Sequence, residues 1–375
     1  FFRKMLGVKT VNAHPTMATR SLACLAQKRN FSSKSYNFQG GRSSTSGVRA
    51  TVWGCSGFLG RYVVNRLGRI GSQCVLPFRG DGMNVRHLRL MGDLGQMVPL
   101  PYDMAETATL HRCMDRSNVV INMIGNMHQT RNYTFDDTHV KVTHRIAKAA
   151  AEAGNVDRFI HVSAHGADLN SPSEFLRSKA KGEEVVRDFF PDAIIFRPTQ
   201  MFGHEDKFLN RYAYFMNLAA GVPLVDAEQK VQPVFVQDVA QAIVNSIAYS
   251  DAPGKVYTLG GPKQYTYTEL LEMISSETVR PDMFPIPLPH PVARVLGQIA
   301  EKALPIKWRL LSADLADQML CDLTVRERDN GFAELQVPMT TLESEINNLM
   351  ILHSGDRVPY RFETKHGTKG AIAPR

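Results

Sequence analysis

Short apolar segments alternate with amphipathic segments along the chain from about residue 50. The amphipathic segments carry apolar residues three and four positions apart, and they predict helices at 57–69, 139–154, 174–190 and 238–250. Continuous apolar runs with crossover helices between them are typical of buried parallel strands, so the pattern predicts an α/β fold with a doubly wound, mostly parallel sheet. The expected strands are 50–54, 73–78, 97–100, 118–125, 158–164, 193–198 and 255–261.

The pattern changes in the last third of the chain. The segment PDMFPIPLPHP (281–291) contains five prolines, and the residues after it are less periodic. We expect a sheet domain over 48–262 and a smaller C-terminal lobe over 263–375, to which 199–231 contributes. The amphipathic stretch 292–308 could rest on a membrane surface or a membrane subunit, but a helix that packs within the lobe is the favoured interpretation.

Positive charge is concentrated at the N-terminus. Residues 1–50 carry nine of the 44 Lys and Arg residues and none of the 36 Asp and Glu residues, so the remainder is close to neutral and a basic nucleic-acid groove is not expected. The acid-free, serine-rich leader predicts a mitochondrial transit peptide over 1–31, with the mature chain starting near Ser32 and an extension over 32–47; a basic tail is the alternative. No apolar run reaches the roughly 18 to 20 residues of a transmembrane helix.

The five cysteines are scattered and form no CxxC pair, so neither a disulfide framework nor a zinc site is predicted, and no other metal site is expected. We interpret the cysteines as small buried side chains. A reducing compartment fits this interpretation.

The segment WGCSGFLG joins the first expected strand to the first expected helix. It places Gly54, Gly57 and Gly60 at three-residue spacing. Glycines at such a turn let the backbone approach a pyrophosphate and let helix and strand pack closely, while the amides at the helix N-terminus face the anion. A tight turn without a ligand would account less well for three glycines, so we predict a dinucleotide site.

The end of the second strand indicates which nicotinamide cofactor is preferred. An acidic residue there accepts a hydrogen bond from the ribose 2′-hydroxyl of NAD. Here the strand ends in LPFRG, and Arg79 offers a planar fork that suits a phosphate, with Asp81 beyond the usual position. We therefore favour NADP(H) over NAD, the alternative being that Arg79 is an ordinary surface cation. Asp103, after the third strand, is a candidate partner for the adenine amino group or else a turn aspartate.

With these elements placed, residues 48–262 resemble the extended or atypical short-chain dehydrogenase/reductase family. In that family a serine positions the substrate oxygen, a tyrosine transfers the proton, and a lysine lowers the tyrosine pKa and holds the ribose. Ser163 and Lys179 match the serine and the lysine, but the tyrosine position is Phe175. No tyrosine lies between Tyr133 and Tyr212, so a neighbour does not easily substitute. The resemblance also implies cofactor contacts from Ser56, Phe58, Leu59, Ile124 and Pro198.

Segments 40–73, 91–96, 175–210 and 231–247 resemble more narrowly the 39 kDa accessory subunits of mitochondrial respiratory complex I. This resemblance implies a subunit that is not an enzyme by itself and that holds NADPH without turning it over. It implies a peripheral position on the matrix side of the inner membrane, where the partners are other complex I subunits near the quinone-site junction of the matrix and membrane arms. Peripheral lipid contact also fits such a position.

Two other functions remain open from the sequence. The chain could be a working NADP-dependent reductase or epimerase in which His165 acts as the acid, although a polar loop residue is the favoured interpretation of that histidine. It could also be a soluble nucleotide-sensing regulator. Turnover of a carbonyl substrate would favour the reductase, and a protein free in the matrix would favour the regulator.

Overall fold

The computed structural model describes most of the chain beyond residue 35. The described residues are 36, 38–130, 132–218, 221–277, 284–303, 312–321, 324–325, 330–350 and 353. The predicted transit peptide over 1–31 lies outside these residues. Among the described helices, none is long and apolar enough to cross a membrane.

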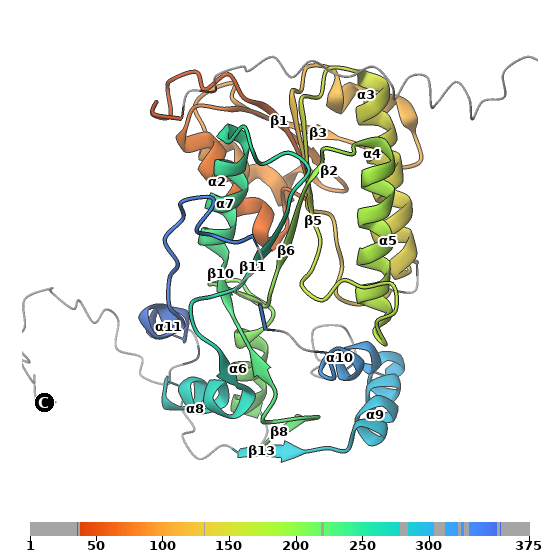
Figure 1. Cartoon of the computed structure of the whole chain (residues 1–375), viewed down its shortest axis with the longest axis vertical. Helices are drawn as coiled ribbons and strands as arrows, with labels where there is room; N and C mark the ends of the chain where they lie inside the picture. The colour runs from red at the N-terminus through yellow and green to blue at the C-terminus, as the bar shows by residue number, and fades with distance from the viewer. Residues whose placement is uncertain are drawn as a thin grey trace, which may run out of the picture. The chain divides into compact units, whose positions relative to one another are not determined.

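Seven strands form one wholly parallel sheet, which lies between the helices in the upper part of Figure 1. The strand order is β11-β6-β5-β4-β1-β2-β3, so the chain runs outward from β1 in both directions, and the order reverses between β1 and β4. In such sheets the ligand site lies at the carboxyl ends of the strands beside this reversal. All seven predicted strands are confirmed, as β1 (Arg49–Trp53), β2 (Gln73–Phe78), β3 (Met97–Pro101), β4 (Val119–Asn122), β5 (Arg158–Val162), β6 (Ile194–Pro198) and β11 (Val256–Leu259).

Helices cover both faces of the sheet, as Figure 1 shows. α2 (Phe58–Arg69) and α7 (Val236–Ala248) pack together over one face. α3 (Thr107–Met114), α4 (Val142–Ala153) and α5 (Glu174–Phe189) cover the other. The four predicted helices are therefore confirmed, except that a π-helical turn, Asp136–Lys141, leads into α4. A 3-10 helix, Gly82–Met91, connects β2 to β3.

A second hydrophobic cluster lies beyond the carboxyl ends of the sheet strands. Its side chains come from residues 202–235, 265–274 and 315–350. The elements around it are short, so tertiary packing rather than long regular structure holds this part together. They are α6 (Leu209–Leu218), α8 (Tyr267–Glu277), α11 (Leu342–Met350) and the strand pairs β7 (Met201–Phe202) with β10 (Val234–Phe235), β8 (Gly221–Leu224) with β13 (Phe284–Pro287), and β9 (Lys230–Val231) with β12 (Tyr265–Thr266).

The predicted boundary between the two lobes is not a simple cut in the sequence. Phe332, Leu335 and Val337 lie after residue 262 but pack in the hydrophobic cluster of the sheet domain. Residues 202–235 precede that boundary, and most of their buried apolar side chains pack in the second cluster, which is the contribution expected of 199–231. The division at residue 262 stays a prediction, with the chain crossing between the clusters several times.

Helix α9 (His290–Ala303) packs against the short helix α10 (Ala313–Gln318) through small residues. Ala293 and Gly297 are buried in this contact. The large apolar side chains of α9 point elsewhere, since Val292, Val295, Leu296 and Ile299 are between 45% and 57% exposed. The expectation of a lobe-packing helix is thus met by the small residues only, and residues 304–308 of the predicted stretch lie outside the described chain.

Candidate functional site

The turn between β1 and α2 has no room for side chains at its glycines. Gly54 has a φ of +80°, and a Cβ there would lie 3.0 Å from the backbone carbon and oxygen of Met123 on the adjacent strand connection. A Cβ on Gly60 would run into the carbonyl oxygen of Gly54 and lie 2.8 Å from the Cα of Cys55. The glycines therefore allow the helix, the strand and the turn to pack at backbone distance.

The N-terminus of α2 is open toward the same turn. Its N-cap residue is Gly57, no side chain among the described residues caps it, and no acidic residue lies in its first turn. The first amides of a helix need acceptors from outside the helix, and the helix dipole makes that end positive. An anion such as a pyrophosphate fits this cradle, which is the arrangement that the sequence predicts.

Arg79 and Asp103 follow β2 and β3 at the same edge of the sheet, and both are exposed. The guanidinium carbon of Arg79 lies 5.6 Å from the ring centroid of Tyr133. The carboxylate of Asp103 accepts a hydrogen bond from the Ala105 amide at 2.9 Å, so part of its capacity serves a local turn. Their positions suit the adenosine end of a dinucleotide, and their roles stay predictions.

A cavity of about 330 Å³ opens at the carboxyl ends of β1, β4, β5 and β6. It begins at the glycine turn and reaches residues of the second hydrophobic cluster. Four of the predicted contacts, Ser56, Arg79, Asp103 and Ile124, lie outside its lining. The predicted contacts that line it are Gly54, Gly57, Phe58, Leu59, Gly60, Ser163, Lys179 and Pro198.

Ser163 and Lys179 both line this cavity, as the family resemblance implies. Ser163 follows β5, is 4% exposed, and its Oγ has no hydrogen-bond partner within the described chain. A buried hydroxyl without a partner is costly, so a ligand atom at this point would satisfy it. Lys179 is 6% exposed, and its Nζ donates to the carbonyl of Val162 at 3.2 Å.

Burial lowers the pKa of Lys179 to about 8, while the nearby Glu183 acts in the opposite direction. A Cβ on Gly125 would lie 3.0 Å from the Lys179 Nζ, so that glycine leaves room for the ammonium. The lysine is therefore held at the cavity wall, where a ribose hydroxyl could accept from it.

Phe175 stands one turn before Lys179 on α5, and its ring lies in an apolar cluster with Phe135 and Leu176. The Phe135 ring meets it edge-on, with centroids 5.8 Å apart. The site therefore has a hydrocarbon surface at the position that the family resemblance assigns to a tyrosine, and Phe175 has no proton to transfer.

His139 lies against Phe175 from the π-helical turn, but it is poorly suited to replace the missing acid. Its Nε2 accepts from the Asn126 amide at 3.1 Å, and its Nδ1 lies 2.8 Å from the Ser178 hydroxyl. Because Ser178 donates its own proton to the carbonyl of Phe175, the hydrogen between them belongs to Nδ1. Burial, with the charge of Lys179, lowers the His139 pKa to about 2, so the imidazole stays neutral.

The sequence analysis did not predict the part of the cavity lining that comes from residues after β6. Lys207, Arg211, Tyr212, Tyr267 and Gln318 all line the cavity. No tyrosine lies close to Phe175 in the sequence, but Tyr212 and Tyr267 line the same cavity in the structure. Burial raises the pKa of Tyr212, and Arg211 acts in the opposite direction.

His165 lines the cavity beyond Ser163. Its Nε2 lies 3.0 Å from the backbone carbonyl of Thr324, an atom that can only accept, so this nitrogen carries the hydrogen. The histidine thus connects the loop after β5 to the C-terminal part of the chain. This contact favours a structural role over that of an acid.

Comparisons with known proteins agree with this geometry. Residues 50–260 match the NAD dependent epimerase/dehydratase family. The chain is 49% identical over 311 residues to the mitochondrial NADH dehydrogenase [ubiquinone] 1 alpha subcomplex subunit 9 of Mus musculus, covering 81% of this chain and 80% of that protein. It is 39% identical over 299 residues to the mitochondrial NADH-ubiquinone oxidoreductase 40 kDa subunit of Neurospora crassa, covering 80% and 78%.

Among solved structures, the triphenylmethane reductase of Citrobacter sp. in complex with NADP(H) has the same fold. The TM-score is 0.63 at 16% sequence identity, with 80% of this chain and 99% of that one covered. At this identity the similarity establishes the Rossmann-like architecture and nothing about the ligand of this chain.

Proposed function

Because the chain belongs to the NAD dependent epimerase/dehydratase family and, within it, groups with the mitochondrial alpha subcomplex subunit 9 proteins, we propose that it is an accessory subunit of mitochondrial NADH:ubiquinone oxidoreductase, complex I. In this proposal the subunit holds NADPH as a structural ligand for assembly and stability and does not turn it over. It sits peripherally on the matrix side of the inner membrane, near the junction of the matrix and membrane arms.

Phe175 carries the non-catalytic part of the proposal. The glycine turn, the open α2 N-terminus, Ser163 and Lys179 are all in place for a dinucleotide. The one group missing is the hydroxyl that transfers the proton, and the ring at 175 is packed against apolar neighbours instead. A site that keeps its binding groups and lacks its acid is suited to hold a nucleotide without reacting it.

The assembly part of the proposal rests on the relatives and on α9. The matching proteins from Rattus norvegicus, Mus musculus and Arabidopsis thaliana are all named as subunits of mitochondrial NADH dehydrogenase. In this chain four large apolar side chains lie exposed along one helix, a pattern that favours a covered surface in a larger assembly.

A native-gel separation of mitochondrial membranes, with mass spectrometry of the band that contains this chain, tests the location. We expect the chain in a band with other complex I subunits. Nucleotide extracted from that band and identified by mass tests the ligand, and NADPH is the expected species. Recovery of the chain as a free matrix protein would favour the nucleotide-sensing regulator instead.

A reductase is the second candidate because Tyr212 and Tyr267 line the cavity with Ser163 and Lys179. In this alternative a tyrosine from the second cluster replaces the one missing at 175. The purified chain with NADPH and a panel of aldehydes, ketones and quinones distinguishes the two functions. Steady NADPH oxidation that Tyr212→Phe abolishes would establish the reductase and refute the structural role.

A further inference from the structure

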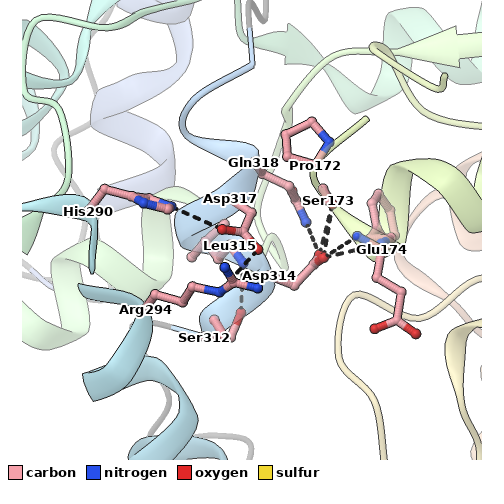
Figure 2. Close-up of polar contacts among 12 residues, drawn as sticks. Pro172, Ser173, Glu174, His290, Arg294, Ser312, Asp314, Leu315, Asp317 and Gln318 are labelled. Atoms are coloured by element: carbon pink, nitrogen blue, oxygen red, sulfur yellow. Dashed lines mark hydrogen bonds and ion pairs between the residues drawn. The ribbon is translucent and has the colours of Figure 1, made fainter. Parts of the chain in front are cut away.

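The carboxylate of Asp314, on α10, lies at the N-terminus of α5, as Figure 2 shows. Its Oδ1 accepts from the Glu174 amide at 2.7 Å and from the Phe175 amide at 3.2 Å. The Ser173 hydroxyl donates to the same carboxylate, at 3.0 and 3.1 Å from its two oxygens. Gln318, one turn further along α10, donates to Oδ2 at 2.7 Å and holds the carboxylate in place.

These contacts account for the amides that a helix start leaves without partners. Asp314 accepts from the first two residues of α5, and the N-cap hydroxyl of Ser173 accepts from the Leu176 amide at 3.3 Å. A negative charge at this end also interacts favourably with the helix dipole. The cap of α5 is therefore shared between Ser173, which precedes the helix, and a residue about 140 positions later in the chain.

The position of α5 along its axis matters for the cavity. The helix carries Lys179, whose Nζ reaches the carbonyl of Val162 at the end of β5. A shift at the first turn would move this ammonium relative to the cavity. Leu315 and Gln318, from the same helix as Asp314, also line the cavity. One short helix thus both holds the start of α5 and forms part of the wall.

The other side of α10 is joined to α9. Asp317 accepts from His290 Nε2 at 3.0 Å and lies 3.7 Å from Arg294 Nε (Figure 2). The two helices also pack at backbone distance, because a Cβ on Gly297 of α9 would lie 2.5 Å from the backbone nitrogen of Ala313. Movement of α9 therefore has to be accommodated by α10.

We propose that Asp314 is a positioning residue for the nucleotide cavity, through which α10 couples nucleotide binding to the arrangement of α9. This inference rests on the proposed nucleotide-holding function. The coupling is reciprocal: nucleotide that fixes α5 also orders α9, and whatever binds α9 changes nucleotide affinity by the same factor.

The test measures two quantities on the full chain: the NADPH dissociation constant, and the protection of α9 amides from hydrogen exchange with and without NADPH. The unmodified chain should bind NADPH and gain protection over 290–303. Asp314→Ala should raise the dissociation constant about fivefold or more, the lower end of measured coupling between sites, and remove the gain in α9. Asp314→Asn, which keeps an acceptor oxygen, should restore part of both.

Two further variants separate positioning from general loss of stability. Asp317→Ala removes the side-chain contacts to His290 and Arg294 of α9 and leaves Asp314 in place, so it should leave the dissociation constant within about twofold while reducing the α9 protection. Asp93→Ala removes an exposed carboxylate that accepts from the Ser43 hydroxyl and the Leu94 amide, and it should change neither quantity. If Asp314→Ala does not fold, Asp314→Asn and Ser173→Ala take its place, and weakened coupling in both is expected.

The outcomes keep this inference apart from the proposed function. An unmodified chain that does not bind NADPH refutes the proposed function. A chain that binds NADPH, but whose Asp314 variants keep the same affinity and the same α9 protection, refutes the positioning role alone.

Discussion

The ring of Phe175 meets the imidazole of His139 edge-on, with centroids 5.3 Å apart and planes at 85°. The ring of Phe135 stacks on the imidazole of His139, with centroids 5.7 Å apart. Burial keeps His139 neutral, so three uncharged rings pack together at the position that the family resemblance assigns to the proton-transferring tyrosine. The substitution at 175 is thus part of the packing and not an isolated change.

The first prediction concerns Phe175→Tyr. We expect this variant to keep its nucleotide and to gain little or no turnover, because the surrounding rings pack Phe175 as part of the wall and no substrate contacts need have been retained. Nucleotide content, melting temperature and NADPH oxidation should be compared with the unmodified chain. A general acid typically contributes about 10² to 10⁴ in rate. A gain of that size in the rate of NADPH oxidation would show that the rest of a reductase site is intact and that only the tyrosine hydroxyl is missing.

The second prediction concerns cofactor choice. Arg79→Ala should weaken NADPH binding about tenfold to a hundredfold, the range expected for a charge-assisted hydrogen bond, and leave NADH binding nearly unchanged. Titration of both nucleotides checks this. Arg89→Ala, which also removes an exposed arginine after β2, is the matched control and should have no effect. Equal affinity of the unmodified chain for NADH and NADPH would contradict the role of Arg79.

The third prediction concerns the glycine turn. Gly60→Ala should abolish nucleotide retention, because the added Cβ meets the backbone of Gly54 and Cys55 and the turn has to move. The loss of a ligand that stands near 1,000 times its dissociation constant removes about 4 kcal/mol from the free energy of unfolding. Gly41→Ala has open space around it and serves as control. Thermal unfolding with and without NADPH gives the measurement, and a Gly60 variant still stabilised by NADPH would refute the prediction.

The fold could be predicted from the sequence because each strand, helix and turn has a pattern within its own short stretch of residues. Each buried parallel strand is a continuous apolar run, so the seven strands were evident one by one, and the glycine spacing marked the turn after β1. Ser163, Phe175 and Lys179 are identified by the family resemblance, and only the one-turn spacing of Phe175 and Lys179 on α5 is a local signal.

The rest depends on contacts between distant segments. Asp314 caps a helix about 140 residues earlier, and Tyr212 and Gln318 line a cavity that the first half of the chain builds. The pattern of residues within one short segment gives no information about such long-range contacts. The orientation of α9 could not be predicted for a second reason. The periodicity of its sequence indicates an apolar stripe, which would be expected to face the protein interior. In the structure α9 instead packs closely against α10 through small residues around Gly297, and these are the buried ones.

The fourth prediction is a pH dependence. The pKa of Lys179 is about 8 in the free chain, and hydrogen bonds from its ammonium to a ribose would raise it. Nucleotide binding then takes up a proton at higher pH, so affinity should be nearly constant just below pH 7 and fall as the pH rises through 8. A rise of about one unit in the pKa of Lys179 on binding gives a fall that approaches tenfold above pH 9. Lys179→Met should bind more weakly and lose this dependence. A flat profile in the unmodified chain would show that the ammonium does not contact the nucleotide.

The fifth prediction concerns the exposed side of α9. Val292, Val295, Leu296 and Ile299 are spaced so that they form one stripe along the helix. In the proposed accessory subunit this stripe is covered by the rest of the complex. Replacing Leu296 and Ile299 together by serine should therefore reduce incorporation into complex I several-fold, as measured on native gels. The melting temperature of the isolated chain should hardly change, because these side chains are already in water.

Leu94→Ser is the matched control for this substitution. Leu94 is a fully exposed leucine in the turn after the 3-10 helix, with a relative exposure of 101%, and it lies far from α9 in the sequence. A single exposed leucine needs no partner to explain it, whereas a stripe of four on one helix does. Incorporation should therefore survive the change at 94 and fail for the pair on α9. Normal incorporation of the α9 variant would mean that this stripe is not covered in the assembled complex, and the contact with other subunits would have to lie elsewhere on the chain.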